Sequence, residues 1–549
     1  MIAAHPDRLI SIGDSLSDSG AAFDLSNVLL AGDLAVPVPA QFVTGPVYAG
    51  VLSNGPVHTQ VTAGLLGLDP AQELFGYAVG GARVLGAQPI GARLSAVEGD
   101  IAVPQGDPLL AFDINVGAQL DRVLAGAAPS PTAAAPGPLG PDNTVLATLF
   151  YGLNDLADIG QSLDDGADPL DVAAALGTLA GAARQTALDL AQSERANAIA
   201  LYTLPAFSFF PPLPGTVPGA AEVADLAIGL FNGAITATAG DIERTTGVEA
   251  QIVRLDAFTA EIDADPATFG FAAKGPVYLD DGVPDADQIL RDDQGAVTEV
   301  VFPVNPDPAL EGLPLDAIQF FDAVHFSAAL HASVGAFGAR SLTHRVRFEG
   351  DGDDRLVSFV GDDLVFGQDG ADALYLGLGD DIAFGGLGDD EILGAAGRDL
   401  LVGGAGADLL RGGSGDDLLA GGAGDDDLQG GAGDDTLLDR AGADRVQAGA
   451  GDDVMIWIDP GAEARAAGAR FDGGAGADVL YIVTDGEVET GGRTLFDILL
   501  GRWDLPGIGV TARGVERVEV LTPEDYAAGT GVEVTVPGLF AEAELWGVA

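Results

Sequence analysis

Aspartate residues recur at every ninth position in the C-terminal half of this 549-residue chain, from Asp354 to Asp453. Each has a glycine two residues before it, and most have an aliphatic residue two positions after it. A carboxylate beside backbone carbonyls supplies the hard oxygen ligands that calcium prefers. The candidate calcium ligands are Asp354, Asp363, Asp372, Asp381, Asp390, Asp399, Asp408, Asp417, Asp426, Asp435, Asp444 and Asp453, with Asp478 in the same local pattern.

A second group of residues has types and spacings suited to nucleophilic catalysis. Ser15 follows an apolar run directly, in the sequence Gly13-Asp14-Ser15-Leu16. A serine on such a strand-to-helix turn is more often a helix N-cap than a nucleophile. Asp322 and His325 change that balance, because a carboxylate three residues from an imidazole can orient it while the imidazole deprotonates a serine.

Two further segments can supply hydrogen-bond donors for a developing oxyanion. The double glycine Gly80-Gly81 forms a turn able to bring a backbone amide close to a ligand. Asn154 follows another apolar run and presents a side-chain amide. Since ligands of parallel sheets bind at the carboxyl ends of the strands, we expect these groups to share one sheet edge.

The elements that must position these residues differ between the two halves of the chain. Residues 1–345 alternate short apolar runs with alanine-rich helical stretches, which predicts an α/β domain with a mostly parallel sheet. Within it, residues 275–314 show no sustained period and are a candidate lid. The expected strands are Leu9–Ile12, Val145–Tyr151, Ala198–Tyr202 and Ala250–Leu255, and the clearest expected helices are Val172–Ser193 and Ala220–Thr245.

The repeats of residues 346–455 predict an all-β parallel roll. Each nine-residue unit makes one turn and one strand, and two units complete a coil, so that aspartates 18 residues apart stack. Without calcium the stacked carboxylates repel each other, so we expect calcium binding to be coupled to folding. An acidic disordered linker is the alternative, but disorder does not require an unbroken register. Residues 456–549 are expected to form a β-rich cap with one further repeat at 473–481.

In their order along the chain, the catalytic candidates resemble the GDSL or SGNH hydrolase family. The resemblance covers about residues 8–340 and implies a three-layer, flavodoxin-like domain. It implies Ser15 as nucleophile, His325 as general base and Asp322 as the residue that orients it. It further implies an oxyanion hole of Ser15, Gly81 and Asn154, with Gly80 as the alternative to Gly81, and no cofactor for catalysis. The longer sequence G-D-S-L-S-D-S-G is most similar to the secreted phospholipase, lecithinase and hemolysin branch.

The nonapeptide resembles the RTX, or hemolysin-type, calcium-binding repeat. That resemblance implies several structural calcium ions and export by type I secretion machinery through an uncleaved C-terminal signal. We therefore expect an extracellular protein, and the first residues lack the plan of a cleaved signal peptide.

Composition excludes several other classes. With 83 acidic against 24 basic residues and a net charge of −59, the chain repels phosphate backbones, so no nucleic-acid partner is expected. The absence of cysteine excludes disulfides, thiolate zinc sites and a cysteine nucleophile. The sequence predicts no transmembrane helix, so membrane contact is expected only at a substrate surface.

Together these features predict a secreted serine ester hydrolase. The predicted activity is that of a lipase or esterase, with phospholipase and lysophospholipase as the more specific candidates. A carbohydrate O-deacetylase or short-chain esterase is the alternative within the enzyme class. A calcium-dependent surface or matrix-binding protein with a vestigial hydrolase domain is the alternative from another class.

Overall fold

A computed structural model places the chain in two compact units, residues 1–343 with 548–549, and residues 344–547. Each unit is described by itself. The described residues are 6–13, 58–78, 84–85, 115–129, 135–136, 143–156, 159, 169–211, 220–266, 269–276, 289–291, 297–300, 310, 313, 318–320, 326–350, 352–440, 442–459, 468–484, 502–505 and 510–522.

The first unit is built on a five-stranded parallel sheet. Its strands are β1 (Arg8–Gly13), β2 (Leu74–Gly76), β3 (Val145–Phe150), β4 (Ala198–Tyr202) and β5 (Glu249–Val253). The strand order is β2-β1-β3-β4-β5, and every neighbouring pair is parallel. This order is that of doubly wound, flavodoxin-like sheets, whose topological switch point lies between β1 and β3. The expected parallel α/β architecture is confirmed.

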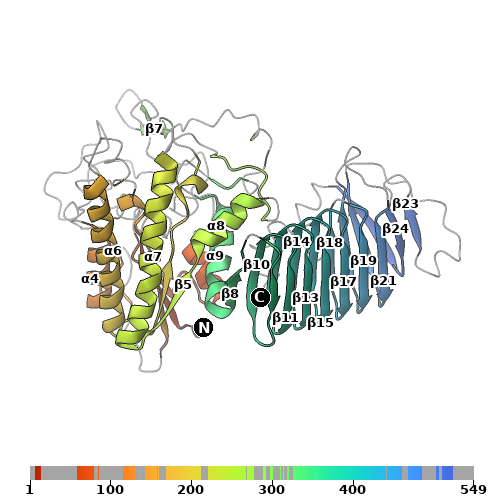
Figure 1. Cartoon of the computed structure of the whole chain (residues 1–549), viewed down its shortest axis with the longest axis horizontal. Coiled ribbons are helices and arrows are strands. Elements are labelled where there is room, and N and C mark those ends of the chain that lie inside the picture. Colours follow the sequence, from red (N-terminus) through yellow and green to blue (C-terminus); the bar gives the residue numbers. More distant parts are fainter. Residues whose placement is uncertain are drawn as a thin grey trace. The chain divides into compact units, whose positions relative to one another are not determined.

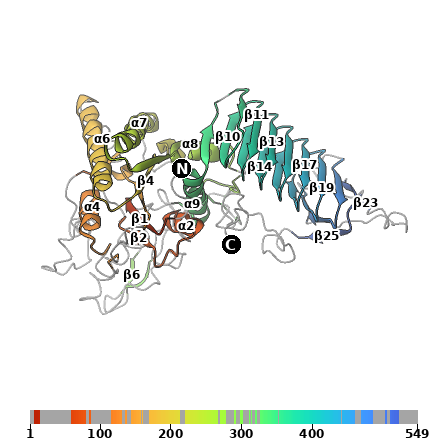
Figure 2. The same ribbon diagram turned by 90° about the horizontal axis from the view of Figure 1, so that it is seen from below.

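Helices cover both faces of this sheet, as expected for strands that are apolar on both sides. Figures 1 and 2 show α4 (Val116–Ala125), α6 (Pro169–Gln192) and α7 (Ala220–Thr246) together on one face. The other face carries α2 (His58–Leu65) and α9 (Ala328–Thr343). The described residues also form α8 (Leu255–Ala264) and the short η3 (Phe207–Phe209).

Helix α7 is the one stretch of the described residues that is long and apolar enough to cross a membrane by length and composition. Within the unit, however, it packs against the sheet through specific polar contacts. The Asn232 side chain donates to the Leu204 carbonyl and accepts from the Leu204 amide, both at 2.8 Å. These contacts fit a helix of the α/β layers.

The predicted lid segment, residues 275–314, contains a short antiparallel pair where the sequence showed no period. Its strands are β6 (Ile289–Arg291) and β7 (Val297–Val300), which pair through an irregular register. The described residues of this segment do not establish whether it closes over a site, so the lid stays a prediction.

The second unit is a roll of two long sheets whose strands alternate along the chain. One sheet contains β8 (Arg345–Phe348), β10 (Asp363–Asp369), β12 (Ile382–Leu387), β14 (Leu400–Ala405), β16 (Leu418–Ala423), β18 (Thr436–Asp439), β20 (Val454–Ile458), β22 (Val479–Val483) and β25 (Arg517–Leu521). The other contains β9 (Arg355–Val357), β11 (Ala373–Leu378), β13 (Glu391–Ala396), β15 (Leu409–Ser414), β17 (Asp427–Ala432), β19 (Arg445–Ala450), β21 (Arg470–Ala475), β24 (Val510–Arg513) and β23 (Trp503–Leu505).

Within the repeats, each strand pairs in parallel with the strand 18 residues further on, so two units make one coil as predicted. The aliphatic residue of each unit points inward, and Leu374, Ile392, Leu410 and Leu428 are fully buried in one continuous core.

Tight turns between the strands require glycine at the fourth repeat position. Gly388, for example, has a φ of 125°, a region that residues with a side chain rarely adopt. A Cβ there would also collide with the Gly370 carbonyl of the preceding coil. The glycine therefore allows adjacent coils to approach closely enough for continuous pairing.

The described strands beyond the repeats continue the roll. Strands β21, β22, β24 and β25 extend the two sheets of the roll, and residues 344–547 are a single compact unit. Within the described part of 456–549, the region expected to cap the roll, parallel strands therefore add to the ends of both sheets.

Candidate functional sites

The carboxyl ends of β1 and β3 lie side by side, with Gly13 and Phe150 as register partners. Ser15 follows β1 by two residues and lies outside the described residues. Gln119 of α4 fixes the end of β1, because its fully buried side chain accepts from the Gly13 amide at 3.0 Å and donates to the Gly13 carbonyl at 2.9 Å. The backbone that leads into Ser15 is therefore clamped at the switch point.

Asn154 follows β3 at the same edge, in a short helical turn. The approach to this turn needs Gly152, whose φ is 112° and whose hypothetical Cβ would stand 2.9 Å from the Phe231 ring. The next residue, Asp155, is buried and points its carboxylate at another segment. Its two oxygens accept from the backbone amides of Val84 at 2.8 Å and Leu85 at 3.0 Å.

These contacts restrain both sides of the double-glycine turn. Gly80 and Gly81 lie outside the described residues, but Tyr77 and Ala78 before them donate to the Ser11 carbonyl of β1, at 2.7 and 3.1 Å. Val84 and Leu85 after them are held by Asp155. The double-glycine turn therefore links a segment that is bonded to β1 with a segment that is bonded to Asp155, the residue next to Asn154.

Asp322 and His325 also lie outside the described residues, and only their flanks can be placed. Phe320 and Phe326 form an antiparallel bridge, and the Ser327 amide donates to the Gln319 carbonyl at 2.9 Å. The two ends of the segment that carries the candidate dyad are thus held together. The assignment of Ser15, Asp322 and His325 as catalytic residues stays a prediction.

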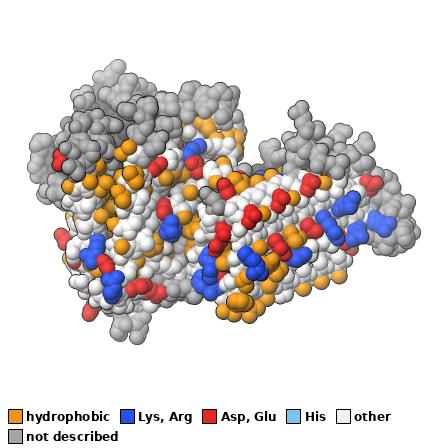
Figure 3. All heavy atoms as spheres, in the orientation of Figure 1, with side chains coloured by type: hydrophobic (Ala, Val, Ile, Leu, Met, Phe, Trp, Pro, Cys, Tyr) orange, Lys and Arg blue, Asp and Glu red, His pale blue; other side chains and the backbone are white. Residues whose placement is uncertain are grey.

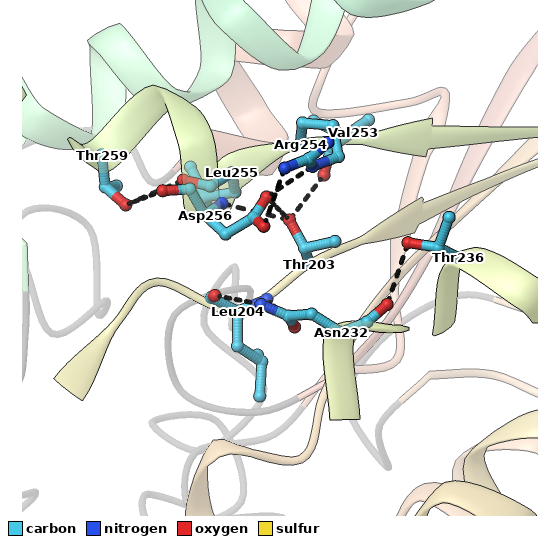
Figure 4. A network of polar contacts seen from close by, with 9 residues as sticks. All are labelled: Thr203, Leu204, Asn232, Thr236, Val253, Arg254, Leu255, Asp256 and Thr259. Atoms are coloured by element: carbon cyan, nitrogen blue, oxygen red, sulfur yellow. Dashed lines mark hydrogen bonds and ion pairs between the residues drawn. The ribbon is translucent and has the colours of Figure 1, made fainter. Parts of the chain in front are cut away.

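Aromatic side chains surround these flanks. Phe209 and Phe210 follow β4 and pack on Phe320 with ring centroids 5.4 and 5.6 Å apart. Figure 4 shows a polar network just after the ends of β4 and β5, in which the Asn232 side chain donates to the Leu204 carbonyl and the Thr203 hydroxyl donates to Asp256. Phe209 and Phe210 are both buried in this aromatic cluster.

Two other histidines, His58 and His331, are buried in the α/β unit. The His58 amide donates to Nδ1 of His331 at 3.2 Å, and the two rings stack. Burial lowers the pKa of His58 to about 3, so the ring is neutral at physiological pH. This contact anchors α9, which begins three residues after His325, beside the start of α2.

In the second unit, the repeat aspartates form two stacked rows with a shared geometry. Within the unbroken repeats, the Oδ1 atom of each aspartate accepts a hydrogen bond from the backbone amide of the aspartate 18 residues earlier. The Asp372 amide donates to Asp390 in this way, and the Asp399 amide donates to Asp417. The Oδ2 atom is buried and has no hydrogen-bond partner. This free oxygen is found in Asp372, Asp381, Asp390, Asp399, Asp408, Asp417, Asp426, Asp435, Asp444, Asp453 and Asp478.

The free oxygen faces a space that suits a hard cation. A Cβ added to Gly385 would collide with the Asp390 carboxylate and stand 2.6 Å from the Gly403 carbonyl oxygen. The space therefore brings a carboxylate and a backbone carbonyl together where a side chain cannot fit. Oxygen ligands of this kind match calcium, and the orphaned buried oxygens fit its presence.

Burial raises the pKa of these carboxyl groups, and neighbouring aspartates raise it further. The pKa reaches about 6 for Asp381, about 7 for Asp390 and Asp408, and about 8 for Asp399. The acidic side chains seen on the surface of the roll in Figure 3 are other residues, since the aspartates of the two rows are buried. A cation beside Oδ2 would favour the ionised form instead.

The first two predicted ligands differ from the rest. Asp354 is only partly buried and accepts from the Gly350 amide at 2.9 Å. The Oδ2 atom of Asp363 already accepts from Arg345 at 2.8 Å and from the Ser358 hydroxyl at 2.6 Å. The Arg345 guanidinium therefore contacts Oδ2 of Asp363, the atom that has no hydrogen-bond partner in the later repeats.

A family model for the RTX calcium-binding nonapeptide repeat, in four copies, matches residues 350–383, 384–419 and 420–455. The matched residues identify the repeat region and leave the α/β unit unassigned. A search of curated proteins finds no match. The repeats thus bind calcium as a structural ion, and repeats of this type are typical of proteins secreted by type I systems.

Proposed function

We propose that the protein is a secreted serine ester hydrolase whose roll folds on calcium after export. The observation that carries this proposal is the convergence at one sheet edge. The residues leading to Ser15, the segments flanking Gly81, and Asn154 itself all meet at the carboxyl ends of β1 and β3. Ligands of doubly wound sheets bind at this switch point.

In the proposed reaction, Ser15 attacks an ester carbonyl and His325, oriented by Asp322, accepts its proton. The backbone amides of Ser15 and Gly81 and the side-chain amide of Asn154 stabilise the tetrahedral oxyanion. Collapse of this intermediate releases the alcohol and leaves an acyl-enzyme. Water, deprotonated by His325, then hydrolyses the acyl-enzyme and frees Ser15.

The proposed substrate is a lipid or phospholipid ester. An apolar cluster around Phe209 and Phe210 lies beyond the end of β4, at the edge where the acyl chain would enter. On neighbouring α7, Val223, Leu226 and Leu230 are 48%, 68% and 62% exposed at helical spacing. An exposed apolar stripe of this kind suits contact with a lipid surface.

A graded ester series tests the proposed function and separates it from its alternatives. Full-length protein in millimolar calcium would be assayed on acyl esters from acetyl to palmitoyl and on phosphatidylcholine, with Ser15→Ala as the control. We expect serine-dependent hydrolysis that rises with chain length. Activity limited to acetyl or butyryl esters would favour a deacetylase or short-chain esterase.

A fluorophosphonate probe supplies an independent readout in the same samples. We expect a covalent adduct on Ser15 in the wild type and no adduct in Ser15→Ala. Absence of both labelling and hydrolysis would favour the calcium-dependent binding protein.

Asp155 provides a sharper test of the sheet edge, because it positions a donor without touching the substrate. Asp155→Asn removes the charge that two amides contact, and hydrogen bonds to charged groups contribute about 1.5–3 kcal/mol. We expect kcat/KM to fall about 10- to 100-fold through kcat, with labelling of Ser15 slowed in parallel.

The matched control is Asp7→Asn. Asp7 accepts from the Thr144 amide at 2.7 Å at the opposite, amino edge of the same strands. An equal loss of activity in both variants, or none in Asp155→Asn, would contradict a positioning role for Asp155.

A further inference from the structure

One turn of the roll has an aspartate at the position that faces the calcium-row carboxylate. Most repeats place glycine first, and a Cβ on Gly421 would stand 2.6 Å from Oδ2 of Asp426. One coil further on, this position is Asp439. A third carboxyl side chain therefore enters the space that glycine leaves open elsewhere.

The three carboxylates lie close together and are buried. One oxygen from each of Asp426, Asp439 and Asp444 lies within 4.8 Å of the others. Their exposures are 3%, 0% and 0%. Asp439 Oδ1 accepts from the Arg440 amide at 2.8 Å, while the Oδ2 atoms of all three are buried and accept no hydrogen bond from an N–H or hydroxyl group. The carboxyl groups of Asp439 and Asp444 contact each other.

A comparison within the roll shows what a polar residue at this position requires. At Asp363 the same position is Ser358, whose hydroxyl donates to Oδ2, and Arg345 adds a positive charge. Asp439 has no hydroxyl proton to donate when ionised. Among the described residues, no ion pair joins an arginine or lysine to the three carboxylates. Buried charges without a partner are strongly disfavoured.

We propose that Asp439 joins the stacked carboxylates Asp426 and Asp444 in a three-carboxylate site for calcium or a similar hard cation, one carboxylate more than two ordinary stacked turns supply. The ligand set consists of oxygen alone, which selects hard cations over softer transition metals. Since affinity for calcium depends on the number of charged ligands, this site binds more tightly than its neighbours. It would fill first as calcium rises and so hold the later coils of the roll together.

Terbium luminescence can report on this site selectively because a tryptophan lies beside it. Trp457 of β20 is the register partner of Asp439, on an adjacent strand about 4.8 Å away. Full-length, calcium-free protein would be titrated with Tb³⁺ under tryptophan excitation. Trp457→Phe identifies the emission that arises here, and added calcium confirms competition for the same site.

The test variants are Asp439→Asn, which preserves shape, and Asp439→Gly, which restores the residue found in most repeats. The matched control, Asp427→Asn, removes a neighbouring carboxylate that contacts Gln429 and alternates to the other face of the strand. We expect both Asp439 variants to move the midpoint of the Trp457-dependent titration to about tenfold higher Tb³⁺ or more. The control should leave it unchanged.

An unchanged midpoint in both Asp439 variants would overturn the proposal. A lower midpoint would overturn it as well, because it would mean that Asp439 and Asp444 share a proton and close the turn to cations. Circular dichroism in saturating calcium would establish that the variants fold. If Asp439→Asn does not fold, Asp439→Gly still provides the test, because it restores the glycine of the ordinary turn.

Discussion

Removal of calcium at pH 8 is expected to unfold the roll while the five-stranded sheet of the first unit stays folded. Each site occupied at about 100 times its Kd adds about 2.7 kcal/mol to the folded state. A few such sites equal the whole stability of a domain, about 5–15 kcal/mol. Without the ions, the buried carboxylates of each row repel across adjacent coils.

The same carboxylates make the effect depend on pH. Their pKa values in the folded roll, from about 6 for Asp381 to about 8 for Asp399, lie above the ordinary value of 3.8. A raised pKa means that the folded state binds protons more tightly than the unfolded chain. The resulting stability is fully present below pH 3.8 and is lost as the pH rises through 6 to 8. The metal-free roll should therefore be more stable at pH 5 than at pH 8, and the effect of calcium should be larger at pH 8.

Hydrogen exchange on the full-length protein can locate the change. With a chelator at pH 8, peptides from 363–459 should exchange rapidly, while peptides from β3 and β4 keep their protection. Thermal melts with and without calcium at pH 5 and pH 8 supply the pH comparison. Equal loss of protection in both units would contradict their independence, and a larger calcium effect at pH 5 would contradict the role of the raised carboxyl pKa values.

The roll could be predicted almost completely because its information is local. A nine-residue register places every turn glycine and inward aliphatic residue, so strand order and aspartate stacking follow directly. The exceptions arise where a distant residue intervenes. Arg345 pairs with Asp363 from 18 residues away, and nothing near Asp363 in the sequence indicates that partner. Asp439 did carry a signal, because it replaces the first glycine of a repeat.

The α/β unit was less predictable for the same physical reason. Its apolar strands were found, but β2 has only three half-buried residues and no clear alternation. Gln119 and Asp155 contact Gly13 and Val84 across separations of 106 and 71 residues. A single sequence contains no sign of such pairs. The residues that perform the proposed chemistry have recognisable motifs, whereas those that position them do not.

Ser15→Ala is expected to reduce ester hydrolysis by about 10³-fold or more, because no acyl-enzyme can form without the hydroxyl. Asn154→Ala should keep the nucleophile and lose one oxyanion donor, which lowers turnover by about 10²–10³-fold. Steady-state kinetics on the best substrate of the ester series would measure both losses. Labelling by the fluorophosphonate should be absent in the first variant and slower in the second.

Comparison of the single and double variants distinguishes two residues that act at one site from two residues with separate structural roles. If Ser15 and Asn154 act on one tetrahedral intermediate, their losses should not add: Asn154→Ala should cost less in the Ser15→Ala background than in the wild type, because the serine-bound intermediate no longer forms. Calcium-dependent melting of the roll should be identical in all three variants, since Asn154 belongs to the other compact unit. Hydrolysis at close to the wild-type rate in Ser15→Ala would instead assign the nucleophile to a different residue and remove the basis for the oxyanion hole at this edge.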